Sequence, residues 1–132
     1  MSSHELNSAM MFVHPPLAIA GHVSVFLFAL ALFLSRDKEK KAVRFAGLAA
    51  WLLTFLGLVT GMIWAQVAWG SYWSWDPKET LTLVLFVAVS ASYISYYEKR
   101  VRLAKGLSVV SCTLSVITAA SSFIIAGLHS FV

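Results

Sequence analysis

Charged side chains are scarce in this sequence. They make up 12% of its 132 residues, whereas 59% of the residues are hydrophobic. Because about a quarter of the residues of a typical soluble domain are charged, a water-soluble globular protein is excluded. The sequence has a single cysteine, so it holds no redox pair of thiols. It also lacks a phosphate-binding loop of the form G-x-x-x-x-G-K-[ST], which means that any ATP-driven step lies in another chain.

The sequence contains four long apolar runs. They lie at about 10–35, 45–68, 81–97 and 107–128, each near the ~20 residues that a membrane-spanning helix needs. Since backbone polar groups in lipid must be paired within their own segment, runs of this length form helices. We therefore predict an all-α protein, a four-helix transmembrane bundle in which 1–132 form a single membrane domain. The first run is predicted to be a retained span and not a signal peptide.

The basic residues predict the orientation of the bundle. Five lie between the first and second runs and four between the third and fourth, and they are Arg36, Lys38, Lys40, Lys41, Arg44, Lys99, Arg100, Arg102 and Lys105. Short cytoplasmic loops are enriched in such residues. Both clusters are therefore predicted to lie inside and to contact anionic lipid headgroups, with no role in nucleic-acid binding. Both termini and the loop at 69–80 are then outside, on the periplasmic or extracellular face of the cell membrane.

Tryptophan is concentrated in that outer loop. Four of the five tryptophans fall between Trp64 and Trp75. An interfacial anchoring belt accounts for two or three of them. The rest favour a flat aromatic surface in which Trp69, Tyr72, Trp73 and Trp75 offer apolar faces while indole N–H groups stay available to polar groups. Such a surface suits a large planar ligand such as haem.

Two histidines flank the aromatic loop in the predicted topology. His14 lies near the outer end of the first run and His129 at the outer end of the fourth. Imidazoles from two helices can supply the two axial positions of one iron. We therefore predict that His14 and His129 are haem-iron ligands, and the alternative is a pair of interfacial histidines without a ligand.

A third histidine lies deeper in the first run. His22 follows His14 by eight residues, which places it about 12 Å further into the membrane and roughly 80° around the helix. Because an ionisable residue within a membrane is by default a functional candidate, His22 is a candidate ligand in a second, deeper site. The alternative is a neutral imidazole that hydrogen-bonds to a carbonyl or a serine of a neighbouring helix.

The end of the outer loop has the pattern of a helix start. Asp76, Pro77 and Glu79 fit the N-cap, N1 and N3 positions of a capping box. Asp76 and Glu79 are therefore predicted mainly to fix the loop, with a direct ligand contact as the alternative. Lys78 is the only basic residue predicted outside. It is a candidate for an ion pair with a haem propionate, and a solvated lysine is the alternative.

Small residues follow one stripe of the fourth run. They are Ser108, Ser111, Cys112, Ser115, Thr118 and Ser122. Such a stripe lets helices approach closely in a membrane. Cys112 is therefore predicted to be a packing residue.

Three segments resemble a known family. The run W-G-S-Y-W-S-W-D-P-K-E-T at 69–80 resembles the Trp-rich WWD signature of the cytochrome c assembly family, the haem-handling membrane proteins of the CcsA, CcmC and CcmF types. G-L-H-S-F at 127–131 is similar to the G-L-H-S-Y of the CcsA type, and H-P-P-L-A-I-A-G-H-V at 14–23 to the H-P-P helix of the CcmF type. Because the segments mix two branches, the resemblance is to the family and not to one branch.

The resemblance implies that a non-covalent, b-type haem is held against the WWD loop, with His14 and His129 as axial ligands, and is presented for covalent attachment to apocytochrome c. The implied partners are apocytochrome c and other maturation subunits, either CcsB-like or Ccm-like. Members of the family usually have six or more spans, so other subunits or a homo-oligomer are expected to supply what four spans lack. The chain could act either as part of a haem lyase or as a haem relay, and the sequence does not decide between these two roles. With one cysteine there is no C-x-x-C-H site for attaching haem to the chain itself.

Two other functions remain open on the residues alone. One is a haem b-containing membrane anchor subunit of a respiratory quinone/cytochrome complex, in which His22 is the central ligand. It is weakened by the need for two histidines at matching depth, since this sequence offers one. The other is a structural membrane subunit with an aromatic belt, which leaves the three matched segments unexplained.

Overall fold

The computed structural model of this chain describes the backbone of residues 3–35 and 40–129, and the side chains of residues 12–35 and 40–121. Within these ranges every regular element is a helix, in the order α1 (Ser3–Leu34), α2 (Lys40–Trp69), α3 (Pro77–Tyr97) and α4 (Val101–His129). Each helix contains a stretch that is long and apolar enough to cross a membrane. The predicted all-α, four-helix fold is therefore confirmed.

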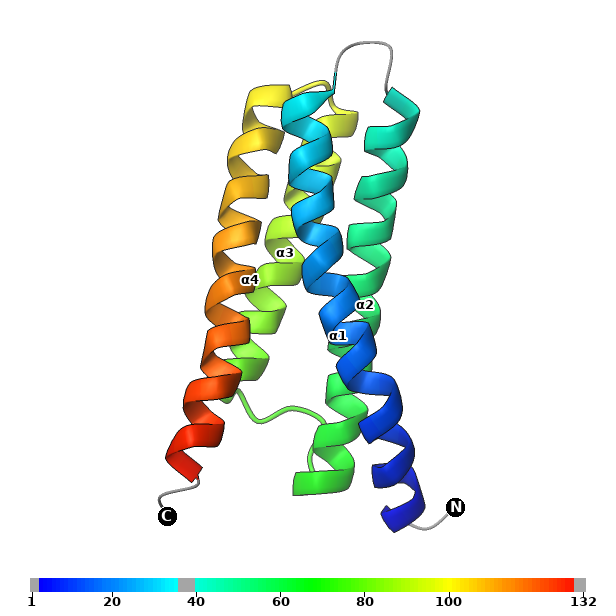
Figure 1. Cartoon of the computed structure of the whole chain (residues 1–132), viewed down its shortest axis with the longest axis vertical. Helices are drawn as coiled ribbons and strands as arrows, with labels where there is room; N and C mark the ends of the chain where they lie inside the picture. The colour runs from blue at the N-terminus through cyan, green and yellow to red at the C-terminus, as the bar shows by residue number, and fades with distance from the viewer. Residues whose placement is uncertain (1–2, 36–39, 130–132) are drawn as a thin grey trace.

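The four helices form a closed ring of antiparallel neighbours. The pairs α1/α2 and α3/α4 share the most extensive contacts, and α1 against α4 and α2 against α3 complete the ring. Up-and-down connectivity brings the start of α1, the end of α2, the start of α3 and the end of α4 to one end of the bundle, where the helices spread apart (Figure 1). The Trp-rich loop lies at this end. Which side of a membrane this end faces, and how much of each helix lies in lipid, stay predictions.

The outer surface of the bundle is apolar, unlike that of a soluble protein, and hydroxyl side chains share the interior with apolar ones. Large apolar side chains point outward, with Phe12 82% and Phe45 75% exposed, whereas Ser92 and Ser111 are 0% and 1% exposed. An apolar surface of this extent marks a membrane or protein contact. Together with the four apolar helices, it makes this a multi-pass membrane protein.

The buried hydroxyl groups are hydrogen-bonded, as an apolar environment requires. Ser92 Oγ donates across the α3/α4 contact to Ala104 O at 2.7 Å, and Ser111 Oγ donates within its own helix to Leu107 O at 2.8 Å. Cys112 lies beside these residues, half-buried, with its Sγ 4.0 Å from the carbonyl of Val25 in α1. The prediction that it is a packing residue in a small-residue stripe is confirmed for the described part of that stripe.

One glycine marks the tightest contact of the ring. A Cβ atom at Gly47 in α2 would lie 2.6 Å from Tyr93 Cε2 of α3 and 2.9 Å from Phe28 Cε1 of α1. No carbon atom fits at such distances without displacing the two rings, which themselves meet edge to face at 6.2 Å. The contact among α1, α2 and α3 therefore depends on the absence of a side chain at Gly47.

We predict that Gly47→Ala lowers stability, because overpacking a tight contact costs about 1–3 kcal/mol. The measurement is the midpoint of thermal unfolding in mild detergent, followed by circular dichroism. Gly106→Ala is the matched control, since a Cβ at Gly106 in α4 meets nothing within 4 Å. It is expected to keep the midpoint or raise it slightly. Equal midpoints for the two variants would contradict the packing described here.

Candidate functional site

The loop that carries the tryptophans begins at a defined helix end. The amide of Gly70 donates to Gln66 O at 3.0 Å, and its φ of +76° lies in the left-handed region that glycine adopts at little cost. This arrangement stops α2 directly after Trp69. The chain then crosses to α3 in seven residues, 70–76.

The far end of the loop is closed by the predicted cap. Asp76 is the N-cap of α3, and its Oδ1 accepts the amide hydrogen of Glu79 at 2.7 Å, with Pro77 at the first helical position. The other half of the capping box differs from the prediction, because Glu79 Oε2 accepts from the amide of Ser74 at 2.8 Å and not from that of Asp76. Glu79 therefore ties down the tip of the loop, two residues before the cap.

Trp75 stands between these two bonds in an uncommon backbone conformation. Its φ is +61°, a left-handed value that bulky residues rarely adopt. Such a conformation persists only when its surroundings hold it. Here the Ser74–Glu79 and Asp76–Glu79 hydrogen bonds hold it on either side. The backbone at Trp75 is thus held by the start of α3.

The aromatic rings do not form the predicted flat surface. Trp73 and Trp75 meet at 5.3 Å with an angle of 87° between their planes, and Trp64 and Trp69 at 5.7 Å with an angle of 83°. Indoles prefer such edge-to-face contacts because the ring edge is positive and the ring face negative. Within each pair the rings are nearly perpendicular and line the region as walls, so neither pair forms a flat shelf. Trp69, Tyr72 and Trp75 remain more than half exposed and so are accessible to a ligand.

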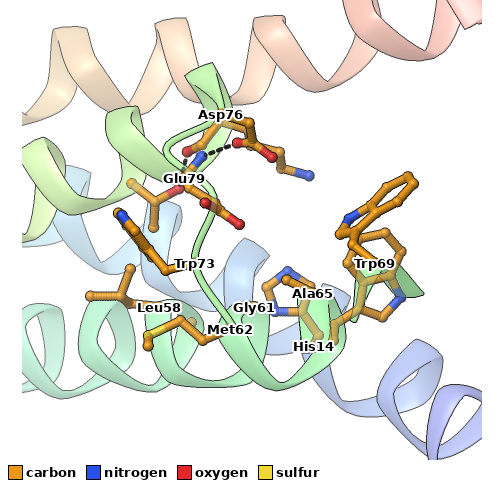
Figure 2. Close-up of a pocket in the computed structure, with 13 residues that line it drawn as sticks. His14, Leu58, Gly61, Met62, Ala65, Trp69, Trp73, Asp76 and Glu79 are labelled. Carbon is orange, nitrogen blue, oxygen red and sulfur yellow. Dashed lines mark hydrogen bonds between the residues drawn. The ribbon is translucent and has the colours of Figure 1, made fainter. Parts of the chain in front are cut away.

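A small cavity lies between these walls. Figure 2 shows His14 of α1 and Gly61 of α2 at its centre, between Trp73 on one side and Trp69 on the other, with Glu79 opposite. Its volume is about 80 Å³. A single water needs about 10–15 Å³ of such space, so this cavity has room for a few waters but not for a porphyrin.

A larger cavity lies beside it among all four helices. It measures about 400 Å³ and is mainly apolar, and its walls include His14 and His22 of α1, Lys78 and Thr82 of α3 and Thr118 of α4. This volume is within the usual range of small-molecule sites. His14 and Lys78 line both cavities. The sequence predicts separate sites for His14 and His22, whereas the structure places both side chains on the wall of one cavity.

Each of these two histidines has a hydroxyl partner on another helix. His14 Nδ1 lies 2.8 Å from Thr60 Oγ1 of α2, and its ring packs on Gly61, where a Cβ would come within 3.2 Å of Cε1. His22 Nδ1 is hydrogen-bonded to Ser115 Oγ of α4. A bond to a serine of a neighbouring helix is the structural alternative predicted for His22.

Two further predicted site residues are His129 and Lys78. His129 is the last residue of α4, at the same end of the bundle as the Trp-rich loop, and its side chain lies outside the described ones. Its role as an iron ligand stays a prediction. Lys78 is exposed, and within the described side chains it has no carboxylate partner, since the salt bridge found there joins Arg100 and Glu98.

Sequence reasoning missed the hydroxyl partners and one carboxylate oxygen. Thr60 and Ser115 are polar residues inside apolar runs, which marks them as candidates, but nothing local names the histidine that each one meets. Glu79 Oε1 is the buried side-chain oxygen without a hydrogen-bond partner in the described part of the chain, and Glu79 lines the small cavity. An unpaired carboxylate oxygen there is an acceptor for a donor group on a ligand.

Comparison with known proteins decides the family. Residues 1–129 match the cytochrome C assembly protein family. The chain belongs to this family. The resemblance inferred from the WWD, H-P-P and G-L-H-S segments is therefore confirmed, and membership favours an assembly role over the respiratory-anchor alternative.

The similar proteins include several named cytochrome c biogenesis protein CcsA. The one from Porphyra purpurea is 33% identical over 140 aligned positions, which cover 99% of this chain and 42% of that protein. Those from Trichormus variabilis and Crocosphaera subtropica are 45% and 43% identical over 60 and 68 residues, covering 46% and 52% of this chain. The chain spans about two fifths of the length of the first and matches a fifth or less of the others. No solved structure matches it.

We predict that Asp76→Ala loosens the loop, because loss of an N-cap side chain costs about 0.5–2 kcal/mol. The measurement is the rate of tryptic cleavage after the exposed Lys78 in detergent, which reports fraying of the first turn of α3. Asp76→Asn is the matched control, because asparagine caps helices as well as aspartate does. Cleavage should be faster in the alanine variant alone, and equal rates in both variants would contradict the role assigned to the cap.

Proposed function

We propose that this cytochrome c assembly protein binds haem at the end of the bundle that carries the Trp-rich loop and presents it for covalent attachment to apocytochrome c. The observation that carries the proposal is the position of His14. Its imidazole lies on the wall shared by the aromatic cavity and the larger apolar one. A possible metal ligand, His14, is thus in contact with both the aromatic cavity and the apolar one.

The residues at this end suit a haem in kind. Histidine is a common axial ligand of haem iron, and the larger cavity supplies an apolar chamber of about 400 Å³. Because the small cavity has no room for a porphyrin, we assign the haem iron to the larger chamber. We propose that the exposed side chains of Trp69, Tyr72 and Trp75, at the same end of the bundle, cover part of the haem. Lys78 is an available cation for a propionate, and Asp76 acts through the loop that it caps.

His129 is proposed as the second axial ligand. It ends α4 at the same end of the bundle as the Trp-rich loop, and His14 of α1 lines a cavity with Trp69 and Trp73 of that region. A pair of ligands from two separate helices makes capture of the iron depend on the assembled bundle. His22, deeper in the larger cavity, would bind iron only in a second site.

The contribution of the chain to the reaction is positional. When bound, the haem supplies vinyl groups to which the cysteine thiols of apocytochrome c add, and this chemistry belongs to the cofactor and the substrate. The chain holds the b-type haem without a covalent bond, excludes water through its apolar walls and keeps the haem at a fixed place, which raises the effective concentration of the reacting groups. Cys112 lies half-buried in the α4 stripe and takes no part.

The complete activity is proposed to involve further parts besides the residues described here, and the chain spans only a fraction of the length of its relatives. We propose that CcsB-like or Ccm-like maturation subunits, or a second copy of this chain, supply them and receive apocytochrome c. The site is assigned to the outer face of the cell membrane. The chain then acts either within a haem lyase or as a relay that hands haem to one.

We predict that the chain purified in mild detergent with added haemin shows a Soret band that depends on His14 and His129. His14→Ala and His129→Ala are each expected to weaken or shift this band, because each removes one axial ligand. His4→Ala is the control, because His4 lies in the polar segment that precedes the first apolar run, and it should leave the spectrum unchanged. If the absorbance is the same in both test variants, the two histidines do not bind the iron and the proposal fails.

We predict that a cysteine at Ser74 reacts with a membrane-impermeant maleimide in intact cells, whereas a cysteine at Glu98 reacts only after the cells are opened. Both changes are made in a Cys112→Ala background and leave the basic residues that set topology in place. Ser74 lies in the Trp-rich loop and Glu98 in the turn between α3 and α4, and both are exposed. The reverse pattern of labelling would place the site on the cytoplasmic face.

A further inference from the structure

The two histidines that line the larger cavity are hydrogen-bonded to hydroxyl groups, and these hydroxyl groups donate their own hydrogens to different acceptors. A neutral imidazole has one N–H group and one nitrogen lone pair, and the partner of one nitrogen decides what the other presents. In both residues it is Nδ1 that meets a hydroxyl, Thr60 Oγ1 for His14 and Ser115 Oγ for His22. What each Nε2 carries therefore follows from where the hydroxyl hydrogen goes.

The hydroxyl hydrogen of Thr60 is used within its own helix. Thr60 Oγ1 lies 2.8 Å from Leu56 O and 3.2 Å from Gly57 O, and a carbonyl oxygen can only accept. A hydroxyl has a single hydrogen, so a Thr60 that donates to these carbonyls meets His14 as an acceptor. The hydrogen between them then belongs to His14 Nδ1. His14 Nε2 is left with a lone pair.

The hydroxyl hydrogen of Ser115 has a different destination. Ser115 is 1% exposed, and His22 Nδ1 is the hydrogen-bond partner of its Oγ in the described part of the chain. If His22 Nδ1 were the donor, the hydrogen of Ser115 would be buried without an acceptor, which is costly. Ser115 therefore donates to His22 Nδ1. The remaining imidazole hydrogen of His22 is then on Nε2.

We propose that Thr60 and Ser115 hold the two histidines in opposite tautomers, so that His14 presents a bare Nε2 to the cavity's occupant and His22 presents an Nε2–H donor. The part that concerns iron rests on the proposed function. Thr60 is a positioning residue, since it prepares His14 Nε2 to bind a metal without touching the metal itself. His22 serves as a hydrogen-bond donor to an acceptor atom of the bound molecule and not as an iron ligand.

The tautomers are tested on the full chain in detergent micelles without haem. Two-bond ¹H–¹⁵N correlation spectra of chain labelled at histidine, recorded above about pH 8 where imidazoles are neutral, distinguish Nδ1–H from Nε2–H rings. His14→Ala and His22→Ala assign the signals. The expected result is an Nδ1–H pattern for His14 and an Nε2–H pattern for His22. The same tautomer in both, or the reverse assignment, overturns the proposal.

Variants of the two hydroxyl residues test the consequence for haem. Thr60→Val keeps the shape but removes the acceptor, and is expected to weaken the affinity for added haemin roughly 10- to 100-fold, as loss of a metal ligand's outer partner usually does. It should also raise the reduction potential, because His14 then donates less electron density. Thr60→Ser is expected to restore both values. Ser115→Ala is expected to remove the Nε2–H preference of His22 in the tautomer spectra.

The possible failures can be told apart. If His14→Ala keeps the haem spectrum, the proposed ligand is wrong, while the tautomer spectra still decide the inference. If His14→Ala loses haem but Thr60→Val changes neither affinity nor potential, the positioning role of Thr60 is wrong and the ligand stands. Circular dichroism of Thr60→Val confirms that its helices are intact. A Soret band that depends on His22 as strongly as on His14 overturns the donor role of His22.

Discussion

Close contact between helices through small and hydroxyl-bearing side chains is the interaction on which the rest of this structure depends. In lipid no hydrophobic force drives helices together, so packing and hydrogen bonds must do so. Ser92 bonds across α3/α4 and Gly47 admits two aromatic rings at the α1/α2/α3 contact. The same hydroxyl chemistry recurs where α1 meets α2 and α4, through Thr60 and Ser115, but there it acts on histidines. Serine and threonine side chains therefore both hold the helices together and bond to the histidines of the candidate site.

The candidate site lies at the end of the bundle where this packing loosens. The helices spread toward the Trp-rich loop (Figure 1), and the apolar cavity of about 400 Å³ lies among them. The loop keeps its form because both of its ends are tied, at Gly70 by the last turn of α2 and at Asp76 by the first turn of α3. This member of the cytochrome c assembly protein family thus has an apolar cavity near a loop whose two ends are held by helix caps.

Local patterns in the sequence were enough to predict the helices and the cap. Apolar runs of spanning length predicted α1 to α4, and the spacing of Asp76, Pro77 and Glu79 predicted the start of α3. The ring angles of the tryptophans were not predictable, because edge-to-face contact depends on how the loop turns. The partners of His14 and His22 lie 46 and 93 residues away on other helices. The sequence of α1 alone suggests separate sites for His14 and His22. The packing of the other helices shows that both side chains line one cavity.

The left-handed backbone at Trp75 has a consequence for how the proposed haem would be bound and released. A residue held in this conformation by bonds on both sides leaves the loop little freedom to lose, so capture of a ligand requires little ordering of the loop. Release of the proposed haem would likewise need no refolding of the loop. Its residence time would then be set by the strength of its bonds to the bundle, against which a receiving protein can compete directly.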